Sequence, residues 1–252
     1  MLHFDDIVFG PIFSRRLGSS LGVNLLPSKG KLCNFDCVYC ECGWNKDGIA
    51  ERRFPRFEEV AAALEEKMAG VSAEGKSVDS ITFSGNGEPT MHPDFPRIID
   101  VTLSCRDRYF PDAKVSVLSN ATLIEREEIA EALMKVDNPI LKIDASSDEL
   151  IAAINRPVGT YRLEDTMKAM LKFNGNFILQ TIFLKSPDFD TAAPAALEKW
   201  IELVRTVKPR EIMVYTIDRE TPDKRLQKYT VEEMEGFVRP LLDEGFIIQV
   251  RG

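Results

Sequence analysis

The sequence predicts an α/β fold, namely a partial parallel barrel of the (β/α)6 type with a long cysteine-bearing loop after the first strand. Short apolar, β-branched runs alternate with helical patterns about every 30 residues, which is the length of one strand–helix–strand unit. Such alternation predicts parallel strands joined by right-handed crossovers, although a doubly wound open sheet is the alternative. The 252 residues suffice for one such barrel, so we expect a single domain over residues 1–252.

The expected elements follow from local patterns along the chain. The predicted strands are Leu21–Leu26, Ser80–Phe83, Val115–Leu118, Ile140–Ile143, Phe177–Phe183, Glu211–Tyr215 and Phe246–Val250. Two helices have apolar stripes at helical spacing, formed by Phe57, Val60, Leu64 and Met68, and by Leu197, Trp200, Ile201 and Val204. Thr230 followed by Glu233 predicts a capping box at the start of the last helix. In either fold, the active site is expected at the C-terminal ends of the strands.

Composition and charge argue against several classes of protein, namely nucleic-acid-binding, secreted and membrane-spanning proteins. The formal net charge is −8, from 40 acidic and 32 basic residues, so the chain lacks the bulk electrostatic signature of a nucleic-acid binder, and tRNA is not the favoured partner. The N-terminus MLHFDDIVFG has no signal-peptide pattern, and no apolar segment approaches the roughly 18 residues that a bilayer crossing needs. We therefore expect a cytoplasmic protein without a membrane partner.

The segment from Pro27 to Pro55 is too long for an ordinary loop and has no clear helical or strand period. Loops of this kind are usually functional. Four of the five cysteines of the chain lie here within ten residues, and in a reducing compartment such a cluster indicates metal binding or redox chemistry rather than disulfides.

Three cysteines of this loop have a spacing suited to an iron–sulfur cluster. The segment KLCNFDCVYCECGW places Cys33, Cys37 and Cys40 in a C-x3-C-x2-C pattern. A closed [4Fe–4S] site uses four thiolates, so three leave one iron open, as in a catalytic metal site, and S-adenosylmethionine (SAM) can fill that position. The alternative is a structural zinc site in which Cys42 supplies a fourth thiolate.

This spacing, with Tyr39 just before the third cysteine, resembles the signature of the radical SAM superfamily. The resemblance implies that the three cysteines bind a [4Fe–4S] cluster and that Tyr39 lies near the adenine of SAM. It also implies a flavodoxin- or ferredoxin-type reductant, and cleavage of SAM to methionine and a 5′-deoxyadenosyl radical. That radical abstracts hydrogen from a substrate, which can be a small molecule or a macromolecule.

A glycine-containing turn follows the strand Ser80–Phe83. In the run ITFSGNGEPT, the candidate cofactor-binding residues are Ser84, Gly85, Asn86, Gly87 and Glu88. Glycines let the backbone approach a ligand closely, and Glu88 adds an acceptor. The run resembles the GGE motif of the family, whose backbone carbonyls and acid receive the SAM ammonium, although Asn86 stands where the common form has glycine. A plain strand–helix turn is the alternative.

Other strand ends supply further candidates. Ser119 and Asn120 are able to hydrogen-bond a ribose, or form an Asx turn or helix cap. Lys142 and Asp144 share one face of a strand, where two charges are costly unless they are paired or functional. Asp144 is therefore a candidate ribose or substrate contact, with a structural ion pair to Lys142 as the alternative. Gln180, inside an apolar strand, is a candidate SAM or substrate contact.

Four stretches resemble one subgroup, the radical SAM proteins similar to tRNA wyosine synthetases. They are GPIFSRRLGSSLGVNLLP, SGNGEPTMHPDF, DASSDELIAAINRP and VYTIDRETP. That group binds a second cluster through additional N-terminal cysteines, and this sequence has none before Cys33, so we expect a relative with another substrate. Wyosine-type tRNA modification and a non-catalytic zinc-stabilised binding module are the alternatives. Arg15, Arg16 and Arg156 can bind a substrate anion or lie in solvated turns.

Overall fold

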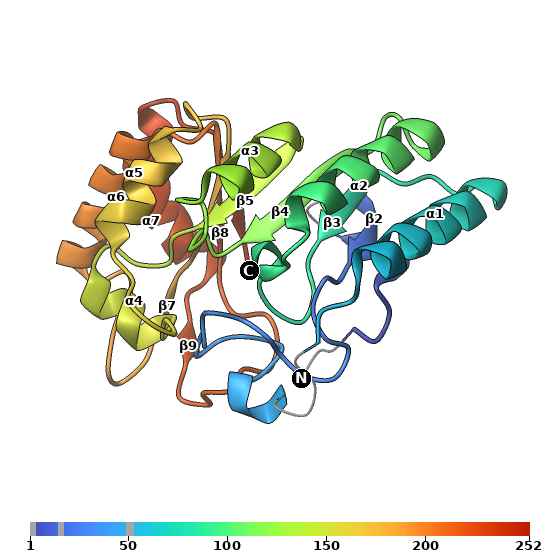
Figure 1. The fold of residues 1–252 in the computed structure, drawn as a ribbon. Helices are drawn as coiled ribbons and strands as arrows, with labels where there is room; N and C mark the ends of the chain where they lie inside the picture. The colour runs from blue at the N-terminus through green and yellow to red at the C-terminus, as the bar shows by residue number, and fades with distance from the viewer. Residues whose placement is uncertain (1–3, 15–17, 49–52) are drawn as a thin grey trace.

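A computed structural model describes residues 4–14, 18–48 and 53–252. Its centre is an eight-stranded sheet with the order β1-β2-β3-β4-β5-β6-β8-β10, and Figure 1 shows the helices outside this curved sheet. The strands are β1 (Val8–Ser14), β2 (Gly18–Val23), β3 (Ser80–Phe83), β4 (Lys114–Ser119), β5 (Asn138–Lys142), β6 (Ile178–Ile182), β8 (Glu211–Tyr215) and β10 (Ile248–Arg251). A separate pair consists of β7 (Leu184–Lys185) and β9 (Gln227–Lys228).

From β2 to β10 every neighbouring pair in the large sheet is parallel. The sheet is not closed, because β1 and β10 are its two edges. The prediction of an α/β fold with a partial parallel barrel is therefore confirmed, and each of the predicted strands corresponds to one parallel strand. The cysteine loop follows β2, which is the first parallel strand along the chain.

One strand of the large sheet was not predicted. Strand β1 pairs antiparallel with β2, and its register is irregular between Phe9 and Ile12. The irregularity contains Gly10 and Pro11, and proline lacks the N–H that a ladder requires. Proline is tolerated here because β1 is an edge strand, and the same residue obscures the strand pattern in the sequence.

The helices are α1 (Phe57–Ala73), α2 (Phe95–Tyr109), α3 (Glu127–Lys135), α4 (Asp148–Ile154), α5 (Leu163–Leu171), α6 (Pro194–Val207) and α7 (Val231–Asp243), with short 3-10 turns η1 (Asn45–Gly48) and η2 (Pro89–Met91). The predicted stripe of α1 is buried at Val60, Leu64 and Met68, and that of α6 at Trp200 and Val204. These faces lie on the outside of a sheet whose strands are largely buried, as expected for parallel strands covered by helices (Figure 1).

The predicted capping box of α7 is confirmed. The Thr230 hydroxyl accepts a hydrogen bond from the Glu233 N–H at 3.1 Å, and the Glu233 carboxylate accepts one from the Thr230 N–H at 2.7 Å. Each bond satisfies a donor that the first turn of a helix leaves unpaired. This cap sets the first residue of α7, the helix that leads into β10.

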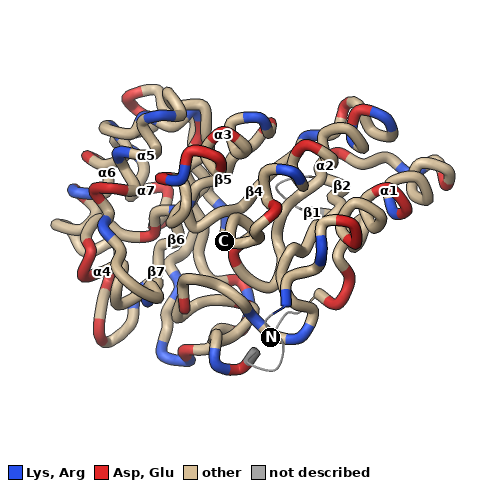
Figure 2. Tube along the Cα trace, in the orientation of Figure 1, with Lys and Arg blue, Asp and Glu red and all other residues tan. Residues whose placement is uncertain are grey.

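The outer helices carry mixed charge. Figure 2 shows acidic and basic residues interspersed along them, and ion pairs such as Arg108–Glu65 and Arg205–Glu244 join neighbouring elements. Exposed pairs of this kind each contribute little to stability. Among the described residues, none of the helices combines the length and apolar character that crossing a bilayer would require.

Candidate active site

Two adjoining cavities lie at the carboxyl ends of the parallel strands. The inner cavity measures about 180 Å³ and the outer cavity about 470 Å³. The residues that line both are Tyr39, Cys40, Leu118, Lys142 and Gln180. Because these residues line both cavities, the two cavities share a wall at the ends of β4, β5 and β6.

The three predicted cluster cysteines are brought together by the loop that follows β2. Cys33, Cys37 and Cys40 all line the inner cavity, and none of them is in a disulfide. Leu32 forms a parallel bridge with Gly87, and Phe35 an antiparallel bridge with Pro157. The loop is thus fixed between the glycine turn and the segment after α4.

The donor set suits a [4Fe–4S] cluster. Within the described ranges, no three His, Cys, Asp or Glu side chains are arranged around a single metal ion. A cluster needs no such convergence, because each thiolate binds a different iron atom. Three free thiols on one buried cavity wall, beside a glycine turn that leaves room for a ligand, fit a cluster with one open iron.

Two of the three sulfurs accept hydrogen bonds from nearby donors. Cys33 Sγ accepts from the Phe35 N–H at 3.4 Å and from Asn120 Nδ2 at 3.7 Å, and Cys37 Sγ accepts from Asn155 Nδ2 at 3.4 Å. Burial raises the pKa of Cys33, and raises that of Cys37 to about 11. Donors to the sulfur oppose this effect, because they stabilise the thiolate that binds metal.

Cys42 lies close to the third cysteine. Its thiol donates a hydrogen bond to the Gly85 carbonyl oxygen at 3.5 Å. The interaction between the two cysteines is the largest cause that lowers the pKa of Cys40 to about 5 and raises the pKa of Cys42. Cys42 thus joins the cysteine loop to the glycine turn beside Cys40.

Lys31 is a buried residue of the inner cavity that the sequence analysis did not single out. Its side chain is 1% exposed and lines the inner cavity. Its ammonium group donates to the Gly43 carbonyl oxygen at 3.2 Å and to Asp36 Oδ1 at 3.3 Å. Burial lowers its pKa, but the surrounding thiolates, above all that of Cys40, together with Asp36, outweigh burial and raise the pKa above its ordinary value. Lysine is seldom buried, so no local pattern indicated this position.

The glycine turn presents its backbone to the inner cavity. Ser84, Gly85, Gly87 and Glu88 line it, as the sequence predicts for a cofactor-binding turn. Gly87 has φ +148°, and a Cβ atom there would lie 1.8 Å from the Leu32 carbonyl oxygen. Only glycine therefore allows the cysteine loop to bridge to this turn.

Asn86 faces away from the inner cavity. Its side chain is fully buried and donates to the carbonyl oxygens of Phe4 and Pro27 at 2.8 and 2.9 Å. Its own carbonyl oxygen accepts from the Leu32 N–H at 2.8 Å. Asn86 thus ties the turn to the segments on its far side, and is not among the residues that line either cavity.

Glu88, Ser119 and Asn120, which the sequence analysis considered separately, form one network. The buried Glu88 carboxylate accepts from Ser119 Oγ at 2.9 Å and from the Asn120 N–H at 2.7 Å. It also accepts from the N–H and hydroxyl of Thr90 at 3.1 and 2.6 Å. Burial raises the pKa of Glu88 above its ordinary value, although these four hydrogen bonds act in the opposite direction. The same hydrogen bonds hold the turn against the end of β4.

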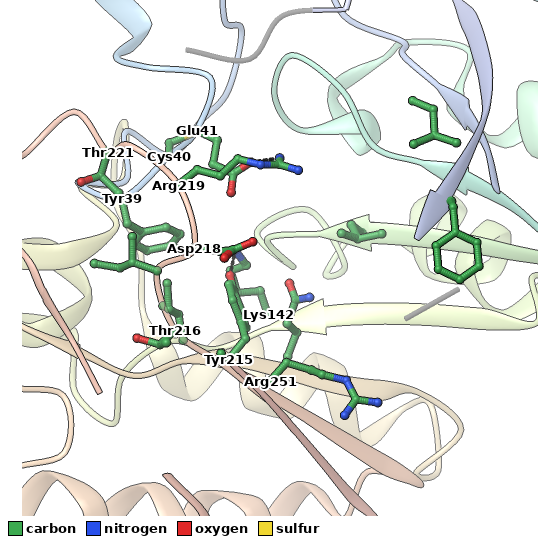
Figure 3. A pocket seen from close by; sticks show the side chains of 17 residues that line it. Tyr39, Cys40, Glu41, Lys142, Tyr215, Thr216, Asp218, Arg219, Thr221 and Arg251 are labelled. Atoms are coloured by element: carbon green, nitrogen blue, oxygen red, sulfur yellow. Dashed lines mark hydrogen bonds and ion pairs between the residues drawn. The ribbon is translucent and has the colours of Figure 1, made fainter. Parts of the chain in front are cut away.

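A second network surrounds Tyr39. Its hydroxyl donates to Asp144 Oδ2, which also accepts from Asn155 Nδ2 at 2.7 Å. Lys142 Nζ donates to the hydroxyls of Tyr39 and Tyr215 at 3.1 and 3.0 Å (Figure 3). Lys142 and Asp144 are thus linked through Tyr39 rather than by a direct ion pair within the described residues. Burial lowers the pKa of Lys142, but the interactions with Tyr215 and Asp144 outweigh burial and raise the pKa above its ordinary value.

The outer cavity opens beyond this network. Its wall includes the segment after β8 together with residues of both sheet edges, and Figure 3 shows Tyr215, Thr216, Asp218 and Arg251 around it. At its rim, Arg219 pairs with Glu41 at 2.6 Å. Gln180, predicted as a ligand contact, lies beside Lys142 on the neighbouring strand and lines both cavities.

Three arginines were candidates for anion binding. Arg15 and Arg16 lie outside the described residues. The Arg156 guanidinium lies 4.8 Å from the centroid of the Trp44 ring, and Arg156 is not among the lining residues of either cavity. Asn155, its neighbour, is the residue of this segment that reaches the site.

Comparisons with known proteins agree with this geometry. A family model described as the Radical SAM superfamily matches residues 28–184. A UPF0026 protein of Methanocaldococcus jannaschii is 29% identical over 90% of this chain and 68% of its own length. A UPF0026 protein of a Synechocystis species is 30% identical over 91% of this chain and 79% of its own length.

The fold is also found among solved structures. A radical SAM methyltransferase from Sphaerobacter thermophilus superposes with a TM-score of 0.68 at 16% identity. The match covers 92% of this chain and 65% of that structure, so the chain spans less than two thirds of its length. At this identity the likeness concerns the fold alone.

Proposed function

Since the chain belongs to the radical SAM superfamily, we propose that it is an enzyme that cleaves SAM reductively and abstracts hydrogen from a substrate in the outer cavity. Family membership implies a [4Fe–4S] cluster and SAM as cofactors. The observation that carries the proposal is that three free thiols and a glycine turn line one cavity that shares a wall with a second, larger one.

We assign the cluster to Cys33, Cys37 and Cys40. The residues proposed to hold or position SAM are Tyr39, Ser84, Gly85, Asn86, Gly87, Glu88, Ser119, Asn120, Asp144 and Gln180. When bound, the cofactors supply an electron from the cluster, homolysis of the S–C5′ bond of SAM, and a radical that abstracts hydrogen from the substrate. The buried walls of the inner cavity exclude water from this chemistry.

Glu88 contributes to SAM binding in a particular way. Three of its four hydrogen bonds are accepted by Oε1, whereas Oε2 accepts the one from the Asn120 N–H. Oε2 thus keeps an open acceptor direction, and we assign the hydrogen bonds from the SAM ammonium to this oxygen and to the backbone of the turn. Glu88 holds that backbone in place and adds a nearby negative charge, while Asn86 supports the turn from behind.

The boundary between the cavities gives a prediction about Lys142. Lys142→Met removes the donor that orients the Tyr39 and Tyr215 hydroxyls, and we expect the KM for SAM to rise about tenfold, which corresponds to ~1.4 kcal/mol. The measurement is the SAM dependence of 5′-deoxyadenosine formation. Iron content should remain that of the wild type, and the surface variant Lys135→Met serves as the control. An unchanged KM at full iron loading would contradict this role.

The proposal as a whole is tested by SAM cleavage. The protein is purified without oxygen, reconstituted with iron and sulfide, and given dithionite and SAM. We expect 5′-deoxyadenosine to accumulate, and omission of the reductant to prevent it. A flavodoxin- or ferredoxin-type protein is the proposed physiological reductant. A colourless protein with stoichiometric zinc and no 5′-deoxyadenosine would instead indicate the zinc-stabilised binding module.

Within the superfamily, we propose a relative of the wyosine synthetase group that acts on another substrate. The four stretches named in the sequence analysis support the relationship. The net charge of −8 and the interspersed charges of the outer helices support a substrate other than tRNA (Figure 2).

A further inference from the structure

We propose that Lys31 is an internal counter-charge that raises the reduction potential of the cluster. The inference rests on the proposed function, because it requires a [4Fe–4S] cluster on Cys33, Cys37 and Cys40. It concerns a different property, namely how easily that cluster accepts its electron.

The position of Lys31 is unusual for a lysine. Its side chain is 1% exposed and lines the inner cavity together with all three ligand cysteines. Burying an ammonium group is costly unless it is paired. The carboxylate within ion-pair distance in the described part of the chain is that of Asp36, whose own side chain is 26% exposed. The thiolates that share the cavity supply the remaining negative charge.

The sign of the effect follows from the charge of the site. One-electron reduction makes the cluster and its three thiolates one unit more negative. A fixed positive charge in a buried, low-dielectric cavity therefore stabilises the reduced form more than the oxidised form. Net charge near a cluster is one of the factors that set its potential. Removal of the Lys31 charge should make the cluster harder to reduce.

Lys31 also has contacts that would suit a purely structural role. Its bonds to Gly43 and Asp36 join distant parts of the cysteine loop. Asp36 separates the two roles, since Asp36→Asn keeps an oxygen acceptor for Lys31 and for the Asn45 N–H but removes a negative charge. If charge sets the potential, Lys31→Met and Asp36→Asn must shift it in opposite directions.

The experiment is an anaerobic potentiometric titration of the reconstituted protein, without SAM, followed by the EPR signal of the reduced cluster. We expect a more negative midpoint potential for Lys31→Met, a more positive one for Asp36→Asn, and the wild-type value for Lys31→Arg. Lys29→Met, at an exposed lysine in the same loop, should leave the potential unchanged because solvent screens its charge.

Two results would overturn the proposal. One is a wild-type potential in Lys31→Met that carries a full cluster, and the other is a shift of the same sign in Lys31→Met and Asp36→Asn. If Lys31→Met does not retain the cluster, Asp36→Asn decides: a positive shift supports the counter-charge and an unchanged potential rejects it. A wild-type protein that takes up no [4Fe–4S] cluster would refute the proposed function itself.

Discussion

Replacement of Cys33, Cys37 or Cys40 by alanine is expected to reduce 5′-deoxyadenosine formation to less than about one hundredth of the wild-type rate. The reason is that each of these thiolates is assigned to a different iron, and loss of a direct ligand should exceed the 10- to 100-fold cost typical of losing a supporting residue. The measurement is 5′-deoxyadenosine formed per chain, together with iron content and visible absorption after reconstitution.

Cys42→Ala is the matched control for these variants. Cys42 lies in the same loop and is buried, but its thiol donates to the Gly85 carbonyl oxygen. We expect this variant to keep its cluster and to lose no more than about tenfold in rate, since it removes a supporting hydrogen bond rather than a ligand. If Cys42→Ala loses the metal as completely as the other three, a four-thiolate site is the better explanation and the assignment of three ligands is wrong.

Gly87→Ala is expected to prevent cluster assembly without touching a cysteine. The new Cβ atom would lie 1.8 Å from the Leu32 carbonyl oxygen, at a residue with φ +148°. Both the backbone strain and the collision are costly, and together we expect a loss of about 2–4 kcal/mol in the free energy of unfolding. The carbonyl belongs to the residue just before Cys33, so the loop must move away from the turn to relieve the contact.

Gly70→Ala provides the comparison for this variant. Gly70 lies on the exposed face of α1, and a Cβ atom there meets nothing within 4 Å. Alanine favours a helix over glycine by about 1 kcal/mol, so Gly70→Ala should keep or increase stability and retain the cluster. Urea denaturation and iron content measure both variants. Normal iron loading and stability in Gly87→Ala would show that the bridge between Leu32 and Gly87 is not needed.

The parallel sheet could be predicted because its strands are short and rich in β-branched and apolar residues, and helical patterns lie between most of them. All four residues of β3 and all five of β6 are buried, and even their polar residues are mostly the small Ser and Thr. Strand β1 differs, since its Gly10 and Pro11 break the pattern at an irregular edge. Its pairing depends on contact with β2, which local propensity does not encode.

The residues of the candidate site could likewise be predicted from the sequence only in part. The strand-end positions indicated Glu88, Ser119 and Asn120 as separate candidates, because parallel strands end at one edge of the sheet, and the structure joins them by hydrogen bonds. Lys31 was missed because its burial cannot be inferred from the loop sequence, and Asn155 because its partner is far away in the sequence. Asn155 binds Cys37, which is 118 positions away, and nothing in its neighbourhood indicates that contact.

The direction in which the side chains of the glycine turn point could not be predicted from the sequence either. Asn86 lies between two residues that line the inner cavity, yet its amide is directed toward Phe4 and Pro27. The fold of the turn, rather than the identity of the residue, decides which side chains face the ligand. The cofactor contact assigned to this position therefore concerns support of the backbone.

The unclosed sheet leaves part of the outer cavity wall without a strand ladder. Residues of β1 and β10, the two sheet edges, both contribute to the wall of the outer cavity, and the described strands are not paired with each other. The cysteine loop and the glycine turn instead follow β2 and β3, which are paired with each other. Widening the outer cavity along the seam between the two edges would therefore break no ladder hydrogen bond and would leave the pairing of β2 with β3 intact.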